Sequence, residues 1–236
     1  MPFSPHPAFV YFDLDDTLLD HHSAQRTALT HLYEHYREAF AGHDLDHVQA
    51  VYHTHNVALW TAYAAGEIDK EMLRRRRFEM LIDALGITSL DPIETGDHYM
   101  ACYADHWRYC AGARDAFLQI AARMPTGILT NGFAEVQHAK LDRFPELRSH
   151  SVSVVISEEV GYLKPHPQLF AEATARAGVG PEQILYVGDS YHSDIAGSRK
   201  AGWQAAWYTP ETTAGGGEEM LRFDDWAALT AALLPR

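Results

Sequence analysis

The chain has 236 residues, 47% of them hydrophobic, which suits one medium domain or a core with a smaller second domain. Lysine and arginine total 19 against 32 aspartates and glutamates, a formal net charge of −13. Such an acidic chain repels a nucleic-acid backbone and an anionic membrane, so we expect neither as a partner. A phosphorylated substrate would therefore need a local group to hold it, such as a metal ion or a lysine.

Features that report on cellular location point to the cytoplasm. No apolar stretch is long enough to span a bilayer. The first residues lack the basic and apolar regions of a signal peptide, so none is expected. The two cysteines, Cys102 and Cys110, do not form a C-x-x-C motif and are predicted to be reduced thiols. The sequence leaves the oligomeric state open between a monomer and a homodimer.

A buried strand is predicted at residues 9–12, and two aspartates follow it directly in Asp13-Leu14-Asp15-Asp16-Thr17. Asp13 and Asp15 are two residues apart, so on extended backbone their side chains share a face. Carboxylates that close repel each other unless a cation, a proton or a hydrogen-bond donor lies between them. A hard divalent cation such as Mg²⁺ would relieve that repulsion. The alternative is a strand that simply ends in a polar loop.

Residues 21–110 have the apolar spacing of helices, and no convincing strand interrupts them. Helices are predicted at 24–40, 45–65 and 70–85, and a further one begins near Pro92. The segment is therefore predicted to form an inserted helical cap domain.

After Gly112 the pattern changes to alternating strands and helices. Strands are predicted at 126–130, 151–156, 184–188 and 205–208, and helices at 115–124, 133–144, 167–177, 194–201 and 223–234. Apolar strands alternating with helices predict an α/β fold, a Rossmann-like parallel sheet covered on both faces. Residues 1–20 and 111–236 would form this core domain.

Ligands of such sheets bind beyond the carboxyl ends of the strands. Polar residues follow these ends in separate segments: Asp13 and Asp15, Thr130 and Asn131, Glu158 and Glu159, and Asp189. Glu158 and Glu159 are expected to lie outside the metal site or in solvent. The helix that begins after Gly132 would offer free N–H groups to an anion.

Three of these segments, together with Lys164 in the loop Leu163-Lys164-Pro165, resemble the haloacid dehalogenase (HAD) superfamily with a C1-type helical cap. The matching residues are Asp13-x-Asp15-x-Thr17, Thr130, Lys164 and Gly188-Asp189-x-x-x-x-Asp194, in that order along the chain. Residues 129–133 and 156–161 resemble the YjjG-type subgroup, which includes pyrimidine 5′-nucleotidases. Tyr63, Gly66 and Arg77-Phe78 in the predicted cap add to that likeness.

The resemblance implies a chemical role for each acidic residue. Asp13 would attack phosphorus and form an aspartyl-phosphate. Asp15 would protonate the leaving oxygen and then accept a proton from water. Mg²⁺ would be bound by Asp13, the backbone carbonyl of Asp15, and Asp189. Asp194 would support the site, orienting Lys164 or a water at the metal.

The resemblance also implies how the substrate is held. Lys164 would act in catalysis by neutralising a phosphoryl oxygen and Asp13, while Thr130 would hydrogen-bond another oxygen. The backbone at Asn131 and Gly132 would lie against the phosphate. The run of four arginines at 74–77 is a solvated helix face or contributes Arg77 to substrate binding.

Asp15 decides between the branches of the superfamily. Haloacid dehalogenases of this kind lack an acid at that position, since a halide leaves without a proton, whereas an alkoxide benefits from one. The expected protein is a Mg²⁺-dependent phosphatase of a small phosphorylated metabolite, with a nucleoside 5′-monophosphate as the first choice. The alternatives are a sugar-phosphate or phosphoglycolate phosphatase, a phosphomutase, a 2-haloacid dehalogenase, and a metal-binding regulator without turnover.

Overall fold

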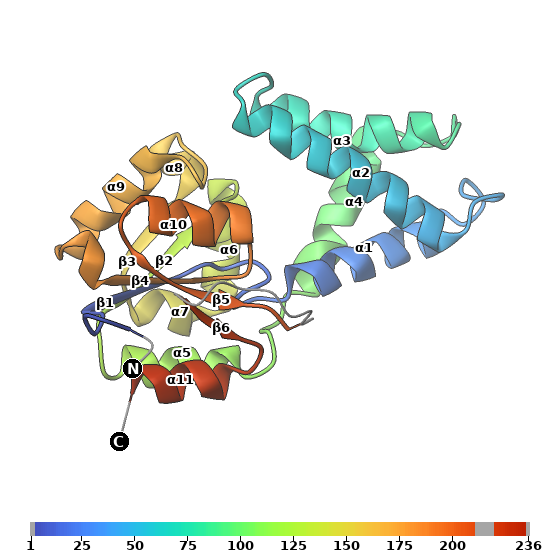
Figure 1. The fold of residues 1–236 in the computed structure, drawn as a ribbon. Coiled ribbons are helices and arrows are strands. Elements are labelled where there is room, and N and C mark those ends of the chain that lie inside the picture. The colour runs from blue at the N-terminus through green and yellow to red at the C-terminus, as the bar shows by residue number, and fades with distance from the viewer. Residues whose placement is uncertain (1–2, 211–219, 235–236) are drawn as a thin grey trace. The chain divides into compact units, whose positions relative to one another are not determined.

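The structure, a computed structural model, describes residues 3–210 and 220–234 (Figure 1). The chain divides into two compact units. The first comprises Met1–Asp20 and Tyr109–Arg236, and the second comprises His21–Arg108. The second unit thus ends at Arg108, whereas the sequence places the end of the cap at residue 110.

A six-stranded sheet forms the centre of the first unit, with strand order β3-β2-β1-β4-β5-β6 (Figure 1). Its strands are β1 (Phe9–Phe12), β2 (Thr126–Thr130), β3 (Ser151–Ile156), β4 (Ile184–Gly188), β5 (Gln204–Tyr208) and β6 (Leu221–Phe223). Every neighbouring pair is parallel, so the predicted α/β class is confirmed. The strand order reverses at β1, which lies between β2 and β4, and a ligand crevice is expected at such a point.

Helices cover both faces of this sheet (Figure 1). They are α5 (Ala113–Ala121), α6 (Ala134–Arg143), α7 (Pro145–Ser149), α8 (Ser157–Val160), α9 (Pro167–Ala177), α10 (Gly197–Lys200) and α11 (Trp226–Leu233). A 3₁₀ turn, Pro181–Gln183, precedes β4, and a π-helical turn, Tyr191–Ala196, follows it.

The alternation of side chains along β1 builds the two halves of the core. Phe12 packs on one face against Phe117 of α5 and Trp226 of α11. Tyr11 packs on the other face against Trp203, in a cluster that includes the apolar side of α9. With both faces covered, every residue of β1 is buried, which fixes the position at which the chain leaves the strand.

Two predicted elements in the C-terminal part are wrong in their bounds. The last helix begins at Trp226 and not at 223, because Asp225 caps it by accepting a hydrogen bond from the Ala227 N–H at 2.9 Å. The residues before it form β6, which is too short to give a clear period-2 signal. The helix predicted at 194–201 is a π-helical turn followed by α10.

The second unit consists of four helices, α1 (His21–His35), α2 (Leu45–Ala64), α3 (Lys70–Ala84) and α4 (Pro92–Asp105). Asp44, Asp69 and Asp91 cap the last three by accepting backbone N–H groups of the first turn. The rings of Phe78 and Tyr99 lie 5.3 Å apart in its core. Among the described residues, no helix combines the length and apolarity needed to cross a membrane.

The packing of the sheet leads to a first prediction at Gly127, the second residue of β2. A Cβ there would lie 2.5 Å from Cε1 of Tyr11 and 2.9 Å from the carbonyl oxygen of Ser153. The Tyr11 ring cannot move aside freely, because its hydroxyl donates to the Ala173 carbonyl at 2.8 Å and lies 2.9 Å from Ser153 Oγ, from which it can accept. Gly127→Ala is therefore expected to lower the free energy of unfolding by about 1–3 kcal/mol, measured by urea denaturation.

Val152→Ala is the matched control, since Val152 lies on the neighbouring strand with 71% of its surface exposed. Its effect is expected to stay within about 0.5 kcal/mol of the unchanged protein. Equal urea midpoints for the two variants would contradict the packing described for Tyr11.

Candidate active site

The candidate site lies in the first unit, at the carboxyl ends of β1, β2 and β4. Asp13 follows β1, Thr130 ends β2, and Asp189 follows β4. Lys164 comes from the loop between α8 and α9. Parallel strands bring these segments to one edge of the sheet, as the sequence predicts.

The ammonium group of Lys164 is the centre of this cluster. Its Nζ lies 2.6 Å from Asp13 Oδ1, 2.8 Å from Asp194 Oδ1 and 2.8 Å from the Tyr186 hydroxyl. A lysine ammonium has three protons, and these three contacts account for all of them. The Tyr186 hydroxyl in turn donates to the Leu129 carbonyl at 2.7 Å, so the lysine is held in one orientation.

Three carboxylates surround this single ammonium. Oxygen atoms of Asp13, Asp189 and Asp194 all lie within 4.8 Å of one another. Burial raises the pKa of Asp13 well above its usual range, although the Lys164 charge opposes that shift. Burial, with the nearby Asp194 and Asp16 carboxylates, raises the pKa of Asp189 to about 7. The single positive charge of Lys164 therefore does not compensate the negative charge of these three carboxylates.

The donor set fits a hard divalent cation such as Mg²⁺. Carboxylate oxygens are the ligands that Mg²⁺ prefers, and a cation among them would offset the burial and the repulsion that raise both pKa values. Asp13 and Asp189 are best suited to bind it. Asp194 is already engaged, since its oxygens accept hydrogen bonds from the Ser190 N–H, the Ser193 hydroxyl and Lys164.

Lys164 itself is rigidly placed by Asn131. The Asn131 side chain accepts a hydrogen bond from the Lys164 N–H at 2.7 Å and donates to the Lys164 carbonyl at 3.1 Å. The backbone at Gly132 is predicted to lie against the phosphate. In the structure its N–H donates a hydrogen bond to Ser157 Oγ at 3.1 Å. Thr130 is fully buried, and its hydroxyl donates to the Asn131 carbonyl at 3.3 Å.

Asp15 has partners that sequence reasoning missed. Both of its carboxylate oxygens lie within hydrogen-bond distance of Lys140 Nζ, at 2.6 and 2.8 Å. The Gln137 amide nitrogen lies 3.0 Å from Asp15 Oδ2 and 2.7 Å from Thr130 Oγ1. Lys140 and Gln137 are both buried and both come from α6.

Other predicted residues lie apart from this cluster. Glu158 Oε2 accepts the Ala134 N–H at the start of α6, and Glu159 pairs with His138. Arg77 belongs to α3 in the second unit, where it is half-buried. Its Nε is buried and has no hydrogen-bond partner among the described residues. The predicted role of Arg77 in substrate binding stays a prediction.

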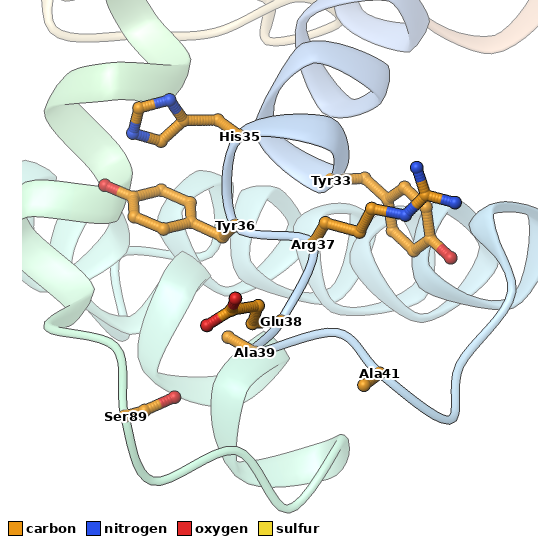
Figure 2. A pocket seen from close by; sticks show the side chains of 8 residues that line it. All are labelled: Tyr33, His35, Tyr36, Arg37, Glu38, Ala39, Ala41 and Ser89. Carbon is orange, nitrogen blue, oxygen red and sulfur yellow. The ribbon is translucent and has the colours of Figure 1, made fainter.

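A surface hollow of about 810 Å³ lies in the second unit (Figure 2). Its lining comes from the end of α1 and the segment that follows it, with one residue from the segment before α4: Tyr33, His35, Tyr36, Arg37, Glu38, Ala39, Ala41 and Ser89. None of these is a predicted site residue.

Comparisons with known proteins assign the family. A family model described as haloacid dehalogenase-like hydrolase matches residues 9–202 of this chain. Pyrimidine 5′-nucleotidase YjjG of Escherichia coli is 33% identical over 201 residues, 84% of each chain. Pyrimidine 5′-nucleotidase PynA of Streptococcus pneumoniae is 32% identical over 205 residues, 86% of this chain and 84% of PynA. This chain belongs to the haloacid dehalogenase-like hydrolases.

A solved structure supports the same assignment. The crystal structure of the HAD-hydrolase YfnB from Bacillus subtilis, described as bound to magnesium, has a TM-score of 0.80 and 26% identity to this chain. The match covers 97% of this chain and 99% of the other. The predicted family, its fold and its hydrolase class are therefore confirmed.

The carboxylate cluster predicts a pH-dependent stability. Because the folded-state pKa of Asp189 is about 7 against an ordinary 3.8, its contribution is favourable at low pH and is lost as the pH rises through 7. In metal-free buffer, Asp189→Asn is expected to raise Tm by about 5 °C at pH 8, with a smaller gain at pH 5.

Saturating Mg²⁺ should raise the Tm of the unchanged protein more than that of the variant, because the variant lacks one carboxylate ligand. Differential scanning calorimetry at both pH values measures both effects. Two results would count against this description of the cluster. One is an equal gain in Tm for Asp189→Asn at pH 5 and pH 8, and the other is an equal rise in Tm with Mg²⁺ for the two proteins.

Proposed function

We propose that the protein is a Mg²⁺-dependent phosphomonoesterase that acts on a small phosphorylated metabolite, with a nucleoside 5′-monophosphate as the best substrate. The observation that carries the proposal is the buried ammonium of Lys164, held between Asp13 and Asp194 with Asp189 alongside. A site of this composition can bind a dianionic phosphate only with added positive charge, which a cation supplies.

The relatives support both parts of the proposal. YjjG and PynA, each about a third identical over most of the chain, carry the name pyrimidine 5′-nucleotidase. The crystal structure of YfnB is described as bound to magnesium. We also infer a cytoplasmic location, which rests on the two free cysteines, Cys102 and Cys110.

Asp13 is the proposed nucleophile. Its buried carboxylate is fixed by Lys164, so little orientational freedom remains to be lost when it attacks phosphorus. Attack turns the Asp13 oxygen into part of an acyl phosphate. The Lys164 proton that faced this oxygen then becomes available to a phosphoryl oxygen, so the lysine stabilises charge as it forms.

Asp15 is the proposed general acid and base, since the leaving oxygen of an alkyl ester needs a proton. Bound Mg²⁺, held by Asp13, Asp189 and the backbone carbonyl of Asp15, would offset the charge of the transferring phosphoryl group. The other phosphoryl oxygens would lie against the Thr130 hydroxyl and the backbone at Asn131 and Gly132. Asp194 acts as a positioning residue for Lys164.

The presence of Asp15 favours ester hydrolysis over dehalogenation, because a halide leaves without a proton. A sugar-phosphate or phosphoglycolate phosphatase is the alternative substrate class. Specificity between these classes depends on side chains that contact the part of the substrate beyond the phosphate, and Arg77 is the residue we propose for that contact.

A substrate screen tests the proposed activity directly. Phosphate release is measured with Mg²⁺ for pyrimidine and purine nucleoside 5′-monophosphates, sugar phosphates and phosphoglycolate, and kcat/KM is compared. We expect the highest kcat/KM for a nucleoside 5′-monophosphate. A higher value for phosphoglycolate or a sugar phosphate would reject the nucleotidase assignment, and release from none of them would reject the phosphatase.

Asp13→Asn tests the nucleophile. The amide cannot attack phosphorus, so phosphate release should fall by at least about 10⁴-fold, while the thermal unfolding profile stays cooperative. Asp142→Asn is the control, because the Asp142 side chain is 73% exposed and pairs with Arg148, which is not a site residue. Turnover in the purified Asp13→Asn protein within tenfold of the control would refute the assignment.

A further inference from the structure

Lys140 forms an ion pair with Asp15, and the reaction proposed above assigns no role to this lysine. The Lys140 side chain is only 3% exposed, and the Asp15 side chain is 23% exposed. Burying an ammonium costs free energy unless it is paired and hydrogen-bonded. The two short contacts from Nζ to the Asp15 oxygens meet that requirement and fix the carboxylate against α6.

A second side chain from the same helix reaches the same carboxylate. Gln137 precedes Lys140 by one helical turn, so both side chains lie on one face of α6. Its amide nitrogen contacts Asp15 Oδ2, Thr130 Oγ1 and the Asn131 carbonyl oxygen. Asp15 is therefore held by two buried donors and cannot change rotamer without breaking contacts with both.

These contacts connect Asp15 to the nucleophile through a continuous network. Gln137 contacts the Asn131 carbonyl, and the Asn131 side chain is hydrogen-bonded to the backbone of Lys164. Lys164 then binds Asp13 through its ammonium group. The proposed acid and the proposed nucleophile are thus supported by one framework.

We propose that Lys140 is a positioning residue that holds Asp15 where it exchanges protons with the reacting oxygens. The inference rests on the proposed function. In the first displacement the bond from Asp13 to phosphorus forms, the bond to the leaving oxygen breaks, and the Asp15 proton passes to that oxygen. In the second, water oxygen bonds to phosphorus, the bond from Asp13 breaks, and a water proton passes to Asp15.

The dependence on leaving group distinguishes this role from a structural one. An alkyl alkoxide needs the proton from Asp15, whereas p-nitrophenolate is stable without it. The experiment compares kcat/KM of Lys140→Met for the best nucleoside 5′-monophosphate and for p-nitrophenyl phosphate. We expect a loss of about 100-fold for the nucleotide and less than about 5-fold for the aryl ester.

Two further variants make the test specific. Lys200→Met removes an exposed lysine of α10 and should leave both kcat/KM values unchanged. Gln137→Met should also lose more kcat/KM for the nucleotide than for the aryl ester, although the loss should be smaller. This variant replaces Lys140→Met in the test if Lys140→Met does not fold. In an Asp15→Asn background, Lys140→Met should cause no further loss for the nucleotide, because Lys140 acts through Asp15.

Equal losses on the two esters in a folded variant, or a further loss in the Asp15→Asn background, would overturn the inference while leaving the proposed function intact. An unchanged kcat/KM for the nucleotide would overturn it as well. If the unsubstituted protein hydrolyses neither ester, the proposed function itself fails, and the inference fails with it.

Discussion

One buried ammonium group organises the candidate site. Lys164 uses its three protons on Asp13, Asp194 and Tyr186, and the Asn131 side chain clamps its backbone from both sides. Since each partner comes from a different segment, the position of the lysine depends on the whole edge of the sheet. The same arrangement leaves excess negative charge on Asp13 and Asp189, which makes the site receptive to a cation.

The parallel sheet explains why distant residues meet at this place. β1 pairs in parallel with β2 and with β4, so all three strands end at the same edge of the sheet. Both faces of β1 are packed, by the ring of Phe12 on one side and that of Tyr11 on the other. A rigid strand end of this kind gives Asp13 a fixed origin, which a nucleophile requires for efficient attack.

Much of the fold could be predicted from the sequence because apolar strands alternate with helices of clear period. The three-residue strand β6 was missed, since so short a segment carries no readable periodicity. Among the site residues, Asp13, Lys164 and Asp189 follow from their motifs, and the structure brings them together. Whether they perform the predicted roles stays a prediction that activity must test.

The contacts of Lys140 and Gln137 could not be predicted in the same way. On sequence alone a lysine and a glutamine in a helix are expected to be solvated, and here both are buried. A signal was present, since Gln137, Lys140 and Leu141 have the spacing of one buried helix face. Which carboxylate such a face would meet depends on tertiary packing, and the sequence does not specify it.

The central claim is that Asp13 becomes covalently phosphorylated in a step that needs a divalent cation. The most direct measurement is an acid quench of the protein with its best substrate, followed by peptide mass spectrometry, with Mg²⁺ present and in excess EDTA. We expect one added phosphoryl group on the peptide that carries Asp13 when Mg²⁺ is present, and none in excess EDTA. A phosphoryl group on another residue, or an equal yield in EDTA, would contradict it.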